Sequence, residues 1–142
     1  MRNRIRFAPR LALVVLAVFA IAASAQAGEI SAADDASVPF IVKIHADWCG
    51  TCTRMDATFE ELETALGSQA RIVVLDVTDR EAVARSREEA NRLGIGEFFE
   101  GNLSKTGTAA VLHGATREPV KVMKGETEVS IYTTAVALAQ GG

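Results

Sequence analysis

Two cysteines, Cys49 and Cys52, are the residues whose type and spacing most directly suggest chemistry. They lie between a β-favouring run at residues 40–46 and a segment whose apolar residues recur at helical spacing. A helix N-terminus carries about half a positive charge and free backbone N–H groups, which favour a thiolate over a thiol. We therefore expect Cys49 to be the more exposed and more acidic thiol, and Cys52 the more buried one. This asymmetry suits a nucleophile that attacks a disulfide and a partner that resolves the mixed disulfide.

Other uses of this cysteine pair remain open. A permanent disulfide across so short a loop would contribute only about 2 kcal/mol in the chain-entropy model, and it would join residues that the helix already holds. The pair could instead bind copper or another soft metal, together with His45 or His113. The pair could also be half of a structural zinc site, but such a site normally takes four nitrogen or sulfur ligands. Beyond the pair, the chain offers no cysteine and only His45 and His113. We expect both histidines to be packed or surface side chains rather than ligands.

The segments around the pair predict an α/β fold. Residues 40–46 are apolar except at Lys43 and His45, which is typical of a mostly buried strand, and residues 71–77 predict a second buried strand. Strands that alternate with helices in this order predict a sheet covered by helices. The other expected elements are a helix from Cys52 to Gly67, a helix capped by Thr78 or Asp79 that runs to Arg92, a loop with a short helical turn over residues 95–107, paired strands at 108–113 and 120–124 with Pro119 at the start of the second, and a closing helix over 129–140 with Ile131, Ala135 and Leu138 on one face.

The first 27 residues predict a secretory signal peptide. Four arginines and no acid are followed by 13 apolar residues at positions 11–23, and Ala25 and Ala27 supply small residues for cleavage. An apolar run of this length is too short to cross a bilayer as a helix, which takes about 20 residues. We therefore expect cleavage near Ala27 and a periplasmic or otherwise exported protein.

Charge and length limit what the remaining chain can do. Residues 28–142 number 115 and carry 11 basic and 18 acidic side chains, so their formal charge is −7. An acidic domain is poorly suited to bind nucleic acid or an anionic membrane, and a chain of this length can bury one core. We expect a mobile lead-in at residues 28–37, one domain at residues 38–142, and a monomer.

At this point the string F-I-V-K-I-H-A-D-W-C-G-T-C and the order of the elements resemble the thioredoxin family over residues 38–140. The A-D-W-C-x-x-C portion is especially similar to the thioredoxin-like C-terminal domain of the bacterial membrane reductase DsbD. The resemblance implies a thioredoxin-like α/β fold, with a central mixed sheet of about four strands flanked by helices. The family's N-terminal strand and helix would be missing or shortened, because few residues precede position 40. It also implies that Cys49 attacks, Cys52 resolves, Trp48 packs beside them, and no organic cofactor is needed.

Lys43 departs from the family pattern, which has a buried acid in the strand that leads to the cysteines. An ammonium group there can lower the pKa of the resolving thiol, but it cannot act as the base that the family's carboxylate is thought to be. We hypothesise that Lys43 pairs with Asp76 on the neighbouring strand. The alternative is that its aliphatic stem carries the ammonium group to solvent.

A second departure is the absence of the family's cis proline before the strand that faces the cysteines. The matching string is Thr106-Gly107-Thr108, so we expect a trans peptide, because a cis bond without proline costs about 2.5 to 4 kcal/mol. Gly107 would let a partner backbone approach closely, and Thr108 would flank the site. Because the resemblance implies that the proline keeps metals off the thiolates, its absence keeps the metal alternative open. A longer segment with Phe98 and Phe99 could flank the site, although aromatic residues also fill cores.

Together these features predict an exported, single-domain thiol-disulfide oxidoreductase that works through Cys49 and Cys52. We expect it to act as a reductant, because of its similarity to DsbD. A reductant in an oxidising compartment needs a membrane donor of electrons, and the resemblance implies client proteins with disulfides, such as apocytochromes. Two other classes stay open: a soft-metal-binding protein that uses the same cysteines, and a redox-inert adaptor that uses the fold as a docking surface.

Overall fold

Four strands form one mixed sheet in the computed structural model, which describes residues 36–141. The sheet order is β2-β1-β3-β4; β1 pairs with β2 in parallel and with β3 antiparallel, and β3 and β4 form an antiparallel hairpin. The strands are β1 (Phe40–His45), β2 (Arg71–Asp76), β3 (Thr108–Leu112) and β4 (Pro119–Lys124). The predicted fold class, a mixed sheet of about four strands flanked by helices, is confirmed.

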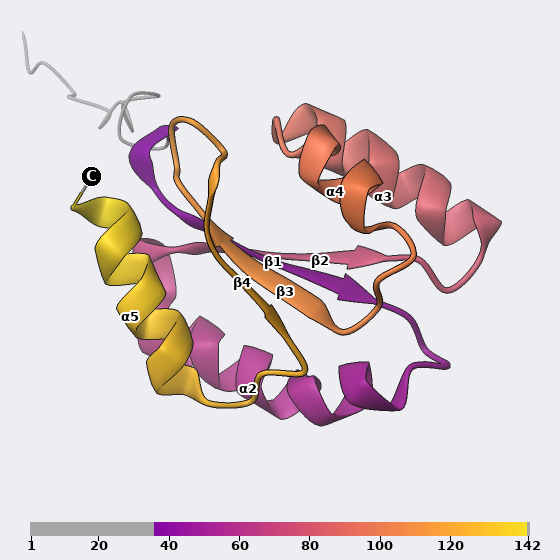
Figure 1. The fold of residues 1–142 in the computed structure, drawn as a ribbon, viewed down its shortest axis with the longest axis horizontal. Helices are drawn as coiled ribbons and strands as arrows, with labels where there is room; N and C mark the ends of the chain where they lie inside the picture. The colour runs from indigo at the N-terminus through magenta and orange to yellow at the C-terminus, as the bar shows by residue number, and fades with distance from the viewer. Residues whose placement is uncertain (1–35, 142) are drawn as a thin grey trace, which may run out of the picture.

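Helices cover both faces of this sheet (Figure 1). One layer holds α2 and α5, and the other holds α3 and α4, so each face has its own hydrophobic cluster. The helices are α2 (Gly50–Leu66), the short 3-10 helix η1 (Gly67–Gln69), α3 (Arg80–Arg92), α4 (Gly96–Asn102) and α5 (Val129–Gln140). In the part of the chain that the structure describes, no helix has the length and apolar character needed to cross a membrane.

The central strand β1 fixes where the cysteines lie. Its first five residues are buried, because helices pack on both faces and strands pair on both edges. Since β1 and β2 are parallel, both end at the same edge of the sheet, and α2 and α3 begin there (Figure 1). The two cysteines therefore lie at the junction between the most buried strand and the first turn of α2.

Local sequence signals set the ends of the first two long helices. The backbone of α2 ends at Gly67, which adopts φ +50° and donates its N–H to the carbonyl of Glu63. The Asp79 carboxylate accepts a hydrogen bond from the N–H of Ala82 (2.8 Å) and caps α3, as predicted. The helix predicted to end at Gly67 and the helix predicted to run to Arg92 are both confirmed.

Three predictions about individual elements were wrong. The second strand is an edge strand with Val74 half exposed, because no described strand pairs with its outer side. Residues 95–107 contain the two-turn helix α4 rather than a loop with a short turn. On α5 the buried face consists of Tyr132, Ala135, Val136 and Ala139, whereas Leu138 is exposed.

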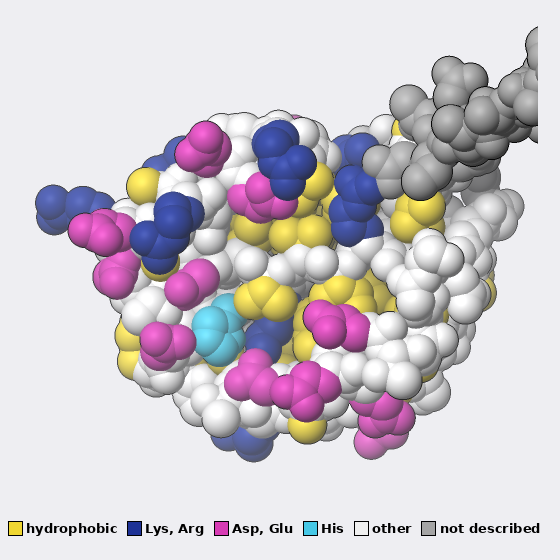
Figure 2. Space-filling model, turned by 180° about the vertical axis from the view of Figure 1, so that it is seen from behind, with side chains coloured by type: hydrophobic (Ala, Val, Ile, Leu, Met, Phe, Trp, Pro, Cys, Tyr) yellow, Lys and Arg dark blue, Asp and Glu magenta, His cyan; other side chains and the backbone are white. Residues whose placement is uncertain are grey.

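The open edge of β2 agrees with the prediction that the family's N-terminal strand and helix are missing or shortened, as far as residues 36–141 go. Figure 2 shows the molecule from behind, where hydrophobic side chains form a band between the layer of α3 and that of α2, and acidic side chains lie on both sides of this band. The predicted signal peptide at residues 1–27 lies outside the described residues, as does the lead-in up to residue 35.

Replacement of Phe99 tests the packing of α4 on the sheet. Phe99 is fully buried, so Phe99→Ala should lower the free energy of unfolding by about 3 to 5 kcal/mol, as measured by urea denaturation. Phe98→Ala is the matched control and should cost clearly less, because Phe98 is only partly buried. Equal losses in the two variants would contradict this arrangement.

Candidate active site

Cys49 and Cys52 form a disulfide at the N-terminus of α2, with their Cα atoms 5.2 Å apart. Cys49 is the N-cap residue, and its Sγ accepts a hydrogen bond from the backbone N–H of Cys52 (3.2 Å). An N-cap side chain normally satisfies one of the free N–H groups of the first turn through oxygen, and here sulfur takes that place. The sulfur of Cys49 therefore lies where the helix dipole stabilises negative charge.

The two cysteines differ in burial in the predicted direction. Cys49 keeps 8% of its surface exposed, whereas Cys52 is fully buried on the apolar stripe of α2. The Cys52 sulfur lies 3.7 Å from the carbonyl oxygen of Ile44, on the central strand. A second disulfide can therefore reach Cys49 more readily than Cys52.

Lys43 lies directly beneath the first turns of α2, with only 1% of its surface exposed. Its Nζ donates hydrogen bonds to the Cys52 carbonyl oxygen (3.1 Å) and to the Asp56 carboxylate. The same ammonium lies 5.1 Å from the centre of the Phe59 ring, within range of a cation–π contact. The buried charge thus has an anion, a carbonyl and an aromatic ring as partners.

The hypothesis that Lys43 pairs with Asp76 was wrong, and so was the alternative that its ammonium reaches solvent. In the parallel pairing Lys43 lies beside Val74, and Asp76 lies beside His45, two pairs further along. The side chain of Lys43 points to the face that α2 covers, where Asp56 lies closer. The carboxylate of Asp76 instead accepts hydrogen bonds from its own loop.

Asp56 is the site residue that sequence reasoning missed. Asp56 lies off the apolar stripe of α2, and its carboxylate is about half exposed. It lies one turn after Cys52, so residues four apart on α2 share the face above Lys43. The sequence did hold a signal for this pair. Lys43 lies in a strand predicted to be buried, where an ammonium group needs an anion, and Asp56 is an acid one helical turn after Cys52.

His45 lies between carboxylates at the end of β1. Its Nε2 is 3.3 Å from Asp47 Oδ1, and its Nδ1 is 3.9 Å from Asp56 Oδ1. The other histidine, His113, forms a hydrogen bond with the Ala139 carbonyl (3.2 Å) at the end of β3 far from the cysteines. Within residues 36–141, no three His, Cys, Asp or Glu side chains are grouped so that they could hold a metal ion.

Trp48 precedes Cys49 in the chain, and Gly107 lies close to the Cys49 sulfur. Trp48 is 67% exposed, and its Nε1 donates to the carbonyl of Thr78 (3.1 Å). Gly107 adopts φ +76°, and a Cβ placed there would lie 2.9 Å from the Thr51 methyl group and 3.8 Å from Cys49 Sγ. Glycine is thus required both by the backbone conformation and by this close approach.

The backbone of Gly107 is already held on both sides. Its N–H donates to the Ile44 carbonyl (2.9 Å), and its carbonyl accepts from the N–H of Gly125 (2.9 Å). No cis peptide bond occurs among the described residues, so the predicted trans peptide at Gly107 is confirmed. Thr108 is buried at the start of β3, next to Gly107 in the chain.

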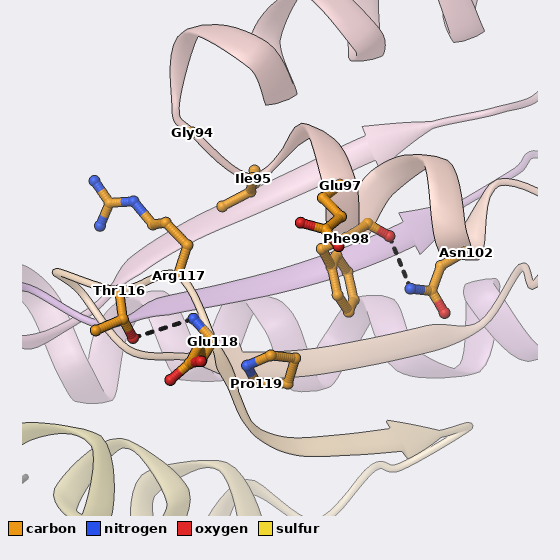
Figure 3. Close-up of a pocket in the computed structure, with 9 residues that line it drawn as sticks. All are labelled: Gly94, Ile95, Glu97, Phe98, Asn102, Thr116, Arg117, Glu118 and Pro119. Atoms are coloured by element: carbon orange, nitrogen blue, oxygen red, sulfur yellow. Dashed lines mark hydrogen bonds between the residues drawn. The ribbon is translucent and has the colours of Figure 1, made fainter.

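Of the two interpretations of Phe98 and Phe99, core filling is the one that the structure confirms. Phe99 is buried in the core, and Phe98 projects from α4 into a pocket lined by hairpin residues such as Pro119 (Figure 3). Because β3 runs antiparallel to β1, this hairpin lies where β1 begins, at the opposite end of the sheet from Cys49. The aromatic pair contributes to packing and to this distant pocket.

Comparison with protein families agrees with this site. The family model described as thioredoxin matches residues 22–91, which include β1, both cysteines, α2 and β2. No curated protein was matched by sequence. The fold and the bonded C-x-x-C pair define a thiol-disulfide oxidoreductase. Residues 22–91 thus match the thioredoxin family, and the fold of the described residues is thioredoxin-like.

Solved structures share the fold. The exposed lipoprotein thioredoxin of Streptococcus pneumoniae is 15% identical, with a TM-score of 0.53 over 75% of this chain and 88% of its own. A thiol:disulfide interchange protein of the thioredoxin family from Chlorobium tepidum is 17% identical, with a TM-score of 0.51 over 79% and 86%. A DsbF homologue from Corynebacterium diphtheriae is 18% identical, with a TM-score of 0.51 over 77% and 76%. At these identities the likeness establishes the fold alone.

Removal of either member of the Lys43–Asp56 pair tests its role in stability. Asp56→Ala should lower the free energy of unfolding by about 2 kcal/mol, because it leaves a buried ammonium without its anion while water still reaches the gap. The double variant Lys43→Met, Asp56→Ala should lose less than Asp56→Ala alone, since no unpaired charge remains. Urea denaturation measures both, and the exposed Glu60→Ala is the control on the same helix. A double variant that loses as much stability as Asp56→Ala alone, or more, would contradict the proposed coupling.

The lowered pKa of Asp76 predicts how the free energy of unfolding depends on pH. Burial acts to raise the pKa of Asp76, but hydrogen bonds from Thr78 and the charges of His45 and Arg85 outweigh it and hold the pKa below its ordinary value of 3.8. The carboxylate therefore stabilises the fold fully above that ordinary value, and this contribution is lost as the pH falls through the lower folded-state pKa. The stability difference between the wild type and Asp76→Asn should be constant near neutral pH and shrink below about pH 4. Urea denaturation across this range measures it, with the exposed Glu61→Gln as control; a difference that grows in acid would be the opposite of the expected result.

Proposed function

We propose that this protein is an exported thiol-disulfide oxidoreductase that reduces disulfides in client proteins. The observation that carries the proposal is the Cys49–Cys52 disulfide at the N-terminus of α2, in which Cys49 keeps a small exposed surface and Cys52 is fully buried. A disulfide that only stabilised the fold would have little to add there, because it joins residues that the first helical turn already brings together. A redox role accounts for both the spacing and the difference in burial.

The proposed reaction begins with the reduced protein. The Cys49 thiolate attacks one sulfur of a client disulfide, the client S–S bond breaks, and the other client sulfur leaves as a thiolate that takes up a proton. The Cys52 thiol loses its proton, and its thiolate attacks the Cys49 sulfur of the mixed disulfide. The second client sulfur then leaves as a thiolate and is protonated. Two electrons pass to the client, and the protein ends with the Cys49–Cys52 disulfide.

The neighbouring side chains have distinct roles in this proposal. The Lys43 ammonium, bonded to the Cys52 carbonyl, places positive charge beside the chain segment that must carry a thiolate. Asp56 offsets part of that charge and is the carboxylate nearest to Lys43. A client segment would contact exposed Trp48, which precedes Cys49 in the chain, and Gly107, which lies close to the Cys49 sulfur; Thr108 is buried next to Gly107 at the start of β3.

Export and the reducing direction are supported by different observations. The basic and apolar pattern of residues 1–27 supports export, and the DsbD-like sequence around the cysteines supports a reductant. A protein that reduces clients in an oxidising compartment must itself be reduced again. We therefore propose an integral-membrane electron donor as a partner, disulfide-bearing proteins as clients, and a monomeric protein.

The reduction potential tests the proposed direction. The chain has one tryptophan, Trp48, which directly precedes Cys49, so its fluorescence should follow a titration with reduced and oxidised glutathione in the absence of metals. We expect a potential near or below that of thioredoxin, about −270 mV. A value near about −120 mV would identify an oxidant, and the absence of any reversible transition would contradict a redox function.

A further inference from the structure

A cavity of about 460 Å³ lies between the start of α4 and the loop that joins β3 to β4 (Figure 3). Ligand pockets in proteins commonly have volumes of about 300 to 1,000 Å³. The buried side chain of Ile95 and the rings of Phe98 and Pro119 form an apolar part of its lining. The cavity lies at the opposite end of the sheet from Cys49, so a molecule bound in it would leave the disulfide accessible.

Specific contacts hold both walls of this cavity in place. The Arg117 Nε donates to the Leu93 carbonyl (3.1 Å), and the guanidinium lies 4.4 Å from the centre of the Phe40 ring. These two contacts fix the loop against the end of α3 and against the core. On the other wall, the side-chain amide of Asn102 donates to the Phe98 carbonyl (2.8 Å) within α4. The cavity is therefore formed before any ligand arrives, which lowers the entropic cost of binding.

The charged groups of the lining favour a cation. Glu97 extends from α4 and Glu118 from the loop, and both side chains are exposed (Figure 3). Neither carboxylate forms a salt bridge with another residue between positions 36 and 141. The third charged residue of the lining, Arg117, already has its guanidinium against Phe40. Carboxylates and an aromatic ring, here that of Phe98, both attract a positive charge.

We propose that this cavity binds an arginine or lysine side chain of a partner protein, with the apolar stem against Phe98 and Pro119 and the charged end near Glu97 and Glu118. The rim favours a side chain over a free small molecule, because Glu97, Glu118 and Pro119 are all exposed and leave room for the partner's backbone. The formal charge of −7 on residues 28–142 also attracts a basic partner over a longer range. The inference does not depend on the proposed reductant function.

Amide chemical shifts in an NMR titration of the full-length protein test this proposal. The probes are a blocked glycine-arginine-glycine peptide and the same peptide with citrulline, a neutral side chain of the same shape, in place of arginine. We expect the arginine peptide to shift the amide signals of residues 94–98 and 116–118, with a dissociation constant of the order of 1 mM. The citrulline peptide should bind about fivefold more weakly, because it lacks the charge that the two carboxylates attract.

Variants of the lining assign the binding to this cavity. Glu97→Gln and Glu118→Gln change exposed side chains, so both proteins should fold, and each should bind the arginine peptide about threefold more weakly. Phe98→Leu keeps an apolar side chain but removes the aromatic ring, and it should weaken binding by a similar factor. Glu61→Gln, at an exposed position of α2 in the other helical layer, is the matched control and should leave the affinity unchanged.

Several outcomes would overturn the inference. Equal binding of the arginine and citrulline peptides would do so, as would an unchanged affinity in both glutamate variants. Tighter binding of a peptide with glutamate in place of arginine would assign the cavity to an anion instead. Shifts caused by butylguanidinium but not by the arginine peptide would show a site for a small free cation and would rule out a partner's side chain.

Discussion

A buried ammonium under the first turns of a helix is the constraint on which the rest of the site depends. Lys43 projects from the central strand, where it cannot reach water, so α2 must supply its partners. The Cys52 carbonyl and the Asp56 carboxylate do so, and both belong to the segment that carries the disulfide. Any shift of α2 along β1 would leave the charge unpaired, at a cost of several kcal/mol. The ion pair thus fixes the cysteines relative to the sheet more specifically than apolar contacts would.

This arrangement changes the electrostatics that the resemblance to the thioredoxin family implies. A carboxylate expected in the strand is replaced by a cation, and the carboxylate lies instead on the helix, where about half of its surface meets solvent. The positive end of the α2 dipole and the Lys43 ammonium both favour a thiolate near Cys52 and Cys49, while Asp56 partly opposes them. The pKa values of the two thiols in the reduced protein should therefore depend on the balance between the Lys43 ammonium and the Asp56 carboxylate.

Sequence reasoning predicted elements with a clear period and missed contacts that depend on three dimensions. The run at β1, the apolar stripe of α2 and the Pro119 hairpin each carry a strong local signal, so their positions were confirmed. Helix α4 was predicted only as a short helical turn, because its two glycines and adjacent phenylalanines fit no single period. The pairing of Lys43 was assigned to the neighbouring strand because both residues were seen as strand residues. The periodicity of a strand shows which side chains share a face of the sheet, but it does not show which helix covers that face. The pairing of Lys43 with α2 could therefore not be predicted in this way.

The central claim is that Cys49 is the activated nucleophile of the pair, and the reactivity of the two thiols in the reduced protein tests it most directly. The rate at which iodoacetamide modifies each cysteine can be followed by mass spectrometry as a function of pH. We predict that Cys49 reacts first and reaches half its maximal rate at a pH below that of the same cysteine in urea-unfolded protein, while Cys52 stays protected. Equal rates for both cysteines, or a Cys49 profile that matches the unfolded chain, would contradict this account.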